Sequence, residues 1–176
     1  NKEKLKFNLP INNNTLHLVF KGNPGTGKTT VARLIGKIYK SIGLLKSGHL
    51  IEVGRHDIVA KYVGHTAKLV EEKFLEAKNG VLFIDEAYTL SSYNNSNDFG
   101  VEAIQTILKL MEDYRNEIVV IVAGYPNEMD LFLSSNPGLK SRFSNIINFE
   151  DYKYSELIEI LVNMINDDMN ILTNEA

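Results

Sequence analysis

The chain has 176 residues, of which 44% are hydrophobic and 23% are charged, a balance typical of a well-packed globular domain. Its net charge of −3 excludes a global basic field for nucleic acid, and the absence of cysteine excludes disulfides and thiolate metal sites. No apolar run approaches the roughly 18 residues that span a membrane, and no apolar signal segment opens the chain. We therefore expect a cytoplasmic protein without a membrane partner, and the missing initiator Met indicates a piece of a longer chain.

Apolar runs alternate with amphipathic segments along the chain. Residues 1–15 are predicted to form an N-terminal loop, and strands are predicted at residues 16–20, 49–53, 80–85, 118–124 and 145–150. Helices are predicted from Lys28 to Ile42, after a cap at Thr66, around residues 104–111 and after Asp151. This alternation predicts an α/β fold with a five-stranded parallel sheet and right-handed crossovers over residues 16–151.

The first predicted strand and helix enclose the pattern G-x-x-x-x-G-K-[ST], a Walker A phosphate loop (P-loop). Its residues are Gly22, Asn23, Pro24, Gly25, Thr26, Gly27, Lys28, Thr29 and Thr30. Backbone N–H groups and the positive end of the helix can hold phosphates. Lys28 is expected to reach the β- and γ-phosphates, and the Thr29 hydroxyl to bind Mg²⁺. The loop predicts ATP and Mg²⁺ as ligands, but kinases, switches, helicases and protein unfoldases all carry one.

Two carboxylates, Asp85 and Glu86, follow the apolar run at residues 80–84. A strand that is apolar on both faces is typical of the middle of a parallel sheet, so both carboxylates are expected at its edge. Asp85 would hold Mg²⁺ through water, and Glu86 would act as general base on the attacking water. The second carboxylate favours hydrolysis over transfer to a bound acceptor.

Three segments, "GNPGTGKTTVARLIGKIY", "LFIDEAYTL" and "AGYPNEMDLFLSSNPGLKSRF", together resemble the AAA+ ATPases. Within them the chain resembles the subgroup of stage V sporulation protein K, red-type (CbbX-like) rubisco activase and the type VII secretion ATPase. The resemblance implies a three-layer P-loop NTPase sandwich, with residues 152–176 starting a helical lid. It also implies a homo-oligomeric ring, commonly a hexamer. Because most of the lid and an upstream adenine-contacting segment are missing, weak ATPase activity is expected of this piece.

The resemblance also implies roles for two further groups of residues. Arg142, in "SRF", matches the arginine finger that acts in trans on a neighbouring subunit's nucleotide, with Lys140 as a weaker second candidate. Tyr62, Val63 and Gly64 resemble the first pore loop of ring translocases, in which an aromatic side chain grips a threaded polypeptide.

Two further positions follow less directly from the resemblance. The polar residues 91–100 would form a second pore loop. Many relatives carry Asn or Thr after the fourth strand to orient the attacking water; here Tyr125 supplies a hydroxyl nearby, and its role stays open.

We therefore expect a ring ATPase that remodels a protein substrate of unknown identity. Two alternatives are a nucleic-acid motor or loader, which the acidic balance makes less favoured, and a non-hydrolysing scaffold or monomeric kinase.

Overall fold

The computed structural model describes residues 15–60, 62, 64–91 and 99–174. Five strands pair in parallel in the order β2-β3-β4-β1-β5. They are β1 (Leu18–Gly22), β2 (Leu50–Val53), β3 (Val81–Ile84), β4 (Val119–Gly124) and β5 (Asn145–Phe149). The five predicted strands are thus confirmed, with boundaries that shift by two residues or fewer.

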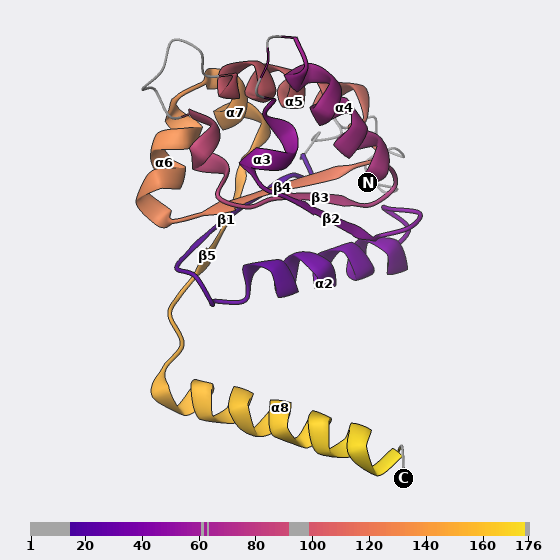
Figure 1. Ribbon diagram of the computed structural model, residues 1–176, viewed down its shortest axis with the longest axis vertical. Coiled ribbons are helices and arrows are strands. Elements are labelled where there is room, and N and C mark those ends of the chain that lie inside the picture. The colour runs from indigo at the N-terminus through magenta and orange to yellow at the C-terminus, as the bar shows by residue number, and fades with distance from the viewer. Residues whose placement is uncertain (1–14, 61, 63, 92–98, 175–176) are drawn as a thin grey trace, which may run out of the picture.

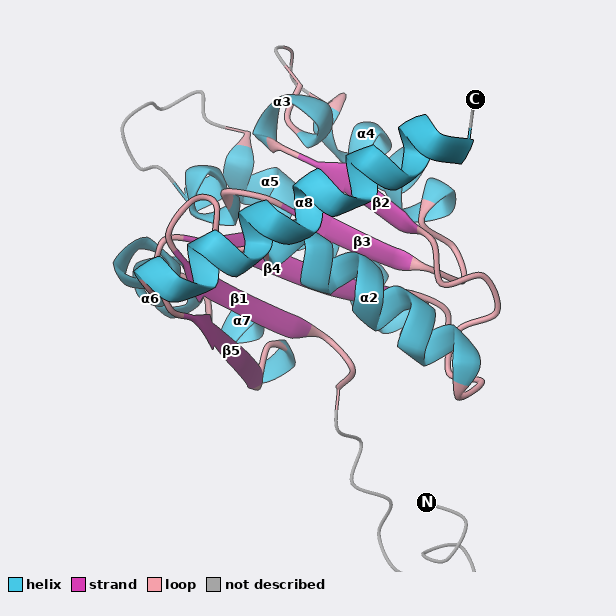
Figure 2. Ribbon diagram, turned by 90° about the horizontal axis from the view of Figure 1, so that it is seen from below, coloured by secondary structure: helices cyan, strands magenta, loops and turns pink. Residues whose placement is uncertain are grey.

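Helices cover both faces of this sheet and complete the predicted three-layer sandwich (Figure 1). One face carries α2 (Lys28–Ser41). The other carries α3 (Arg55–Ile58), α4 (Thr66–Glu76), α5 (Gly100–Asp113), α6 (Pro126–Ser134) and α7 (Pro137–Arg142). A 3₁₀ turn, η1 (Ala87–Ser91), follows β3. The view from below shows α2 running roughly along the strands, on the face of the sheet towards the viewer (Figure 2).

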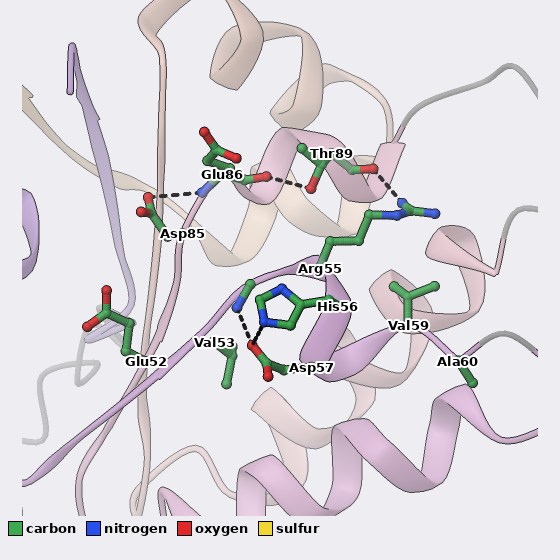
Figure 3. Close-up of a pocket in the computed structure, with 11 residues that line it drawn as sticks. Glu52, Val53, Arg55, His56, Asp57, Val59, Ala60, Asp85, Glu86 and Thr89 are labelled. Atoms are coloured by element: carbon green, nitrogen blue, oxygen red, sulfur yellow. Dashed lines mark hydrogen bonds and ion pairs between the residues drawn. The ribbon is translucent and has the colours of Figure 1, made fainter.

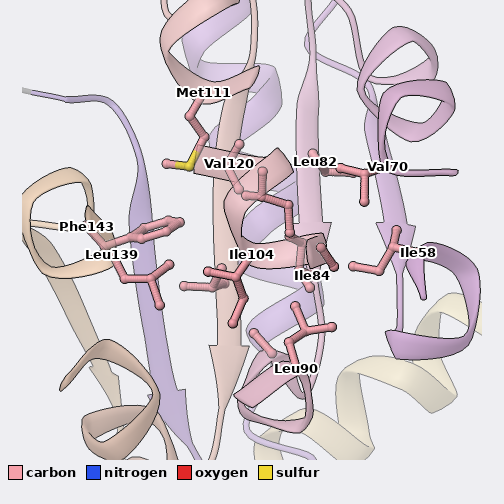
Figure 4. Close-up of a cluster of buried hydrophobic side chains, with 14 of the residues drawn as sticks. Ile58, Val70, Leu82, Ile84, Leu90, Ile104, Met111, Val120, Leu139 and Phe143 are labelled. Atoms are coloured by element: carbon pink, nitrogen blue, oxygen red, sulfur yellow. The ribbon is translucent and has the colours of Figure 1, made fainter. Parts of the chain in front are cut away.

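The alternation of side chains along each strand divides the core into two hydrophobic clusters. On β3, Leu82 and Ile84 point into the larger cluster, under α3 to α7, while Val81 and Phe83 pack on the α2 side. Figure 4 shows the larger cluster, where Ile104 of α5 meets the sheet. Each fully buried side chain of this size stabilises the fold by about 1.5–3 kcal/mol. β3 is buried on both faces along its whole length, up to the residue before Asp85.

The structure corrects one predicted helix start and adds elements that were not predicted. Thr66 does not cap α4: His65 occupies the cap position, and the Thr66 hydroxyl accepts a hydrogen bond from the Ala60 N–H at 3.1 Å. The short elements α3, η1, α6 and α7 were not predicted, because one or two turns carry too little helical periodicity. Proline begins both α6 and α7, at Pro126 and Pro137, as is common at the first helical position.

The helix predicted after Asp151 is present as α8 (Tyr154–Asn174). It runs apart from the sandwich, on the side of the sheet that carries α2 (Figures 1 and 2). Apolar side chains of its first turns are exposed, among them Leu157, Leu161 and Ile165. Among the described residues, no helix is long and apolar enough to cross a membrane.

Candidate functional site

The residues predicted to bind nucleotide gather at one edge of the sheet. The P-loop follows β1, Asp85 and Glu86 follow β3, and Tyr125 follows β4, so all lie at the carboxyl ends of parallel strands. The chain leaves β1 towards the α2 face and leaves β4 towards the opposite face (Figure 1). Ligands of open α/β sheets bind outside such a switch point.

The spacing of the strands leaves room for phosphates between the two halves of the site. β4 separates β1 from β3, so the P-loop and Asp85 start from strands about 10 Å apart. Thr29, on the first turn of α2, is half-buried, as is Asp85. A hydroxyl and a carboxylate are the hard oxygen ligands that Mg²⁺ prefers. These residues therefore fit a magnesium–nucleotide complex.

Two glycines give the P-loop its shape. Gly25 and Gly27 have φ values of 77° and 85°, in the left-handed region that favours glycine. Gly27 is also the N-cap of α2 and has no side chain with which to cap it. Its neighbours on the first turn include Thr30, which is exposed. The first N–H groups of α2 are therefore left without a side-chain cap, an arrangement that suits an anion.

Lys28 and Thr26 fasten the loop internally. The Lys28 ammonium donates hydrogen bonds to the carbonyls of Gly22 at 2.9 Å and Asn23 at 2.7 Å. The buried Thr26 hydroxyl donates to the Asn23 carbonyl at 2.8 Å. The backbone of the P-loop thus wraps around the Lys28 side chain.

The two carboxylates differ in backbone conformation. Asp85 accepts a hydrogen bond from the Glu86 N–H at 3.0 Å, and its own N–H donates to the Val53 carbonyl at 2.9 Å. Glu86 has a φ of 47°, an unusual value for a residue with a side chain, and its carbonyl accepts from both the N–H and the hydroxyl of Thr89. Such strain costs about 1–3 kcal/mol and is concentrated at functional sites.

Tyr88 is a neighbour of Glu86 that was not predicted from the sequence. Burial raises the pKa of the Tyr88 hydroxyl to about 12, helped by the charge of Glu86 and by a hydrogen bond with its side chain. The Tyr88 ring lies against Gly124, where an added Cβ would come within 2.7 Å of it. The Tyr125 ring packs on Tyr88 with the ring centroids 5.8 Å apart. Tyr125 is therefore linked to Glu86 only through Tyr88, which lies between them in this chain of contacts.

A pocket of about 750 Å³ opens beside the two carboxylates, on the β2 side (Figure 3). Asp85 and Glu86 line one wall, and residues of α3 line the other. Arg55 donates to the Thr89 carbonyl across the pocket, and the Gly54 N–H donates to the Asp57 carboxylate at 2.8 Å. Solvent can therefore reach both carboxylates from this side.

Arg142 lies at the opposite edge of the sheet from the P-loop. Its charge adds to burial in lowering the pKa of His17, which comes immediately before β1, to about 4. The Arg142 guanidinium pairs with Glu112 of α5 at 3.8 Å, and its buried Nε has no hydrogen-bond partner among the described residues. Within one chain, Arg142 is thus remote from the phosphate loop. The second candidate, Lys140, is exposed on α7.

The predicted pore-loop residues lie between α3 and α4, and Val63 falls outside the described residues. The Tyr62 side chain is 75% exposed, and Gly64 is left-handed with a φ of 78°. A hollow of about 440 Å³ is lined by Tyr62, His65, Leu69 and others. Residues 92–98, most of the predicted second pore loop, are also outside the described part of the chain.

Comparison with known proteins identifies a family for this chain. The family model for the ATPase family associated with various cellular activities (AAA) matches residues 18–151. The chain is 49% identical over its whole length to stage V sporulation protein K of Bacillus subtilis, covering 54% of that protein. It is 47% identical, over 97% of its length, to the chloroplastic ribulose bisphosphate carboxylase/oxygenase activase of Cyanidioschyzon merolae, covering 58% of it.

The chain spans little more than half the length of these relatives. Among solved structures, the FIGL-1 AAA domain in complex with ADP superposes with a TM-score of 0.64, over 87% of this chain and 49% of that one. Its sequence identity of 23% supports the fold alone.

Proposed function

Because this chain belongs to the AAA family of ATPases, we propose that it hydrolyses ATP within a ring and uses the energy to remodel a protein partner. The observation that carries hydrolysis is Glu86, an exposed carboxylate in a strained left-handed conformation beside Asp85. The two carboxylates lie at the same edge of the sheet as the P-loop.

In the proposed site the P-loop N–H groups and Lys28 hold the phosphates, while Thr29 and Asp85 hold Mg²⁺. When bound, Mg²⁺ would neutralise charge on the phosphate oxygens. Two carbonyls of the loop hold the Lys28 ammonium within it, beside the N–H groups that would bind the phosphates.

Glu86 accepts the proton of the attacking water in this proposal. The Tyr88 side chain lies close enough to Glu86 for the two to interact electrostatically, and the Tyr125 ring packs on the Tyr88 ring. Tyr125 therefore acts on Glu86 only indirectly, through Tyr88. It does not itself orient the attacking water.

The position of Arg142 supports its action on a neighbouring subunit. Because it lies at the opposite edge of the sheet from its own P-loop, it would meet phosphates only in an assembly. A guanidinium there would stabilise the charge that spreads in the transition state. The Arg142 side chain is 31% exposed and its contact with Glu112 is long, at 3.8 Å, which leaves terminal N–H donors for that task.

The exposed ring of Tyr62 supports a grip on a polypeptide. An aromatic ring packs against many side chains, which suits a sequence-tolerant contact. One relative is named as an activase of another enzyme, and this agrees with a protein as the partner.

Phosphate release from ATP tests the catalytic part. Glu86→Gln should abolish turnover and keep ATP binding, whereas Glu71→Gln, on the exposed side of α4, should change neither. Full ATP turnover by Glu86→Gln would refute the assignment of Glu86 as the general base.

Mixing two inactive variants tests the action in trans. Subunits with Glu86→Gln retain Arg142, and subunits with Arg142→Ala retain Glu86, so a mixture should recover part of the activity. Arg115→Ala is the matched control, because Arg115 also pairs with Glu112, at 3.5 Å. Failure of a mixed assembly to recover activity would exclude an arginine finger in trans.

A further inference from the structure

The segment that leaves β5 runs along the P-loop. β1 and β5 pair up to Gly22 and Phe149, and an added Cβ at Gly22 would lie 2.6 Å from the Phe149 Cβ. Two residues later, both carboxylate oxygens of Asp151 accept hydrogen bonds from the Asn23 side-chain amide, each at 3.0 Å. The contact between the two segments thus continues beyond the end of the sheet.

Tyr152 extends this contact to the far side of the loop. Its hydroxyl donates to the Thr26 carbonyl at 3.3 Å. It also lies over Gly27, where an added Cβ would come within 3.0 Å of the hydroxyl oxygen. Asp151 and Tyr152 therefore hold Asn23 at the start of the loop and Thr26 near its end.

We infer that Asp151 and Tyr152 are positioning residues of the nucleotide site, which keep the P-loop in its phosphate-binding shape before nucleotide arrives. The inference rests on the proposed nucleotide site. A loop that must be ordered on binding loses affinity in proportion to the fraction of time it spends in the wrong shape. The glycines of this loop increase the conformational entropy that it loses on ordering, so contacts from outside the loop add to those that Lys28 and Thr26 make within it.

The sign of one mutational effect separates this role from simple electrostatics. Asp151 carries a negative charge and contacts the proposed phosphate-binding loop through the Asn23 side chain. On Coulombic grounds alone, removal of this charge should tighten nucleotide binding. A positioning role predicts the opposite, because Asn23 loses its acceptor and the loop becomes less ordered.

The test measures mant-ADP affinity with Mg²⁺ for Asp151→Ala, Asp151→Asn and Tyr152→Phe. Asp151→Ala should bind about three- to tenfold more weakly, the effect of losing one or two net hydrogen bonds. Asp151→Asn removes the charge but retains an acceptor for the Asn23 amide, so it should bind at least as tightly as the wild type. Glu150→Ala is the matched control, since this exposed neighbour has no side-chain hydrogen bond among the described residues.

Amide hydrogen exchange of residues 22–27 in the nucleotide-free protein provides a second readout. It should accelerate several-fold in Asp151→Ala and stay unchanged in Glu150→Ala. Tighter or unchanged mant-ADP binding, together with unchanged exchange, would overturn the inference. If the wild-type protein bound no mant-ADP, the proposed nucleotide site would fall, and the exchange data would still decide whether Asp151 orders the loop.

Discussion

Replacement of His17 by Asn should remove a pH dependence from the stability of this fold. His17 is 4% exposed, and its Nδ1 accepts a hydrogen bond from the Val120 N–H at 3.0 Å. Burial and the charge of Arg142 lower its pKa from 6.5 to about 4. Asn offers an amide oxygen as acceptor at all pH values, so it can replace the neutral imidazole.

The sign and size follow from the two pKa values of His17. Between pH 6.5 and about pH 4, the unfolded chain binds a proton at His17 that the folded chain does not, so acid favours unfolding. From about pH 7.5 to about pH 5, this difference lowers the free energy of unfolding by about 2 kcal/mol. In His17→Asn the same change of pH should lack that contribution.

Urea denaturation gives the free energy of unfolding of each protein at the two pH values. The effect of His17 is the change with pH in the wild type minus the change with pH in His17→Asn. Carboxylates titrate equally in both proteins and cancel. His65→Asn is the matched control, because His65 is exposed, and it should keep the wild-type pH dependence. Equal pH dependence in wild type and His17→Asn would refute the assignment of a buried neutral imidazole.

Three further predictions concern ion pairs, glycines and Tyr88. In the Lys21–Asp130 pair, Lys21 is 10% exposed and Asp130 is 66% exposed, so Asp130→Ala should destabilise by about 1–3 kcal/mol in urea denaturation and Lys21→Met by clearly less. Gly27→Ala should abolish mant-ADP binding, whereas Gly43→Ala, also left-handed but with open space around its Cα, should only lower stability by about 1 kcal/mol. Tyr88→Phe should lower kcat for ATP and leave mant-ADP affinity unchanged; a loss of affinity alone would contradict its placement beside Glu86.

The sequence was sufficient for those parts of the site that local patterns determine. The strand before Asp85 is apolar throughout, and the P-loop has a fixed pattern, so both were placed at the correct edge. The location of Arg142 could also have been derived: it precedes the start of β5 at Asn145 by only three residues, which puts it at the amino edge of a parallel sheet.

Other features depend on contacts between distant segments. The hydrogen bond from Asn23 to Asp151 exists because β5 pairs beside β1, an arrangement no local pattern reveals. Thr66 had the residue type of a helix cap, but the Ala60 N–H uses its hydroxyl instead. Tyr88 was visible in "LFIDEAYTL", yet only its packing on Gly124 directs it towards Glu86.

The strand order has a consequence for synthesis of the chain on the ribosome. β1 pairs only with β4 and β5, and Leu18 meets its first partner, Ile121, roughly a hundred residues further along. At about 5–20 residues per second, β1 emerges some 5–20 s before any strand can pair with it. During that interval the apolar residues of β1 and α2 must be shielded by other means. The strand that leads into the phosphate loop therefore waits longer for its first partner than any other strand of the sheet.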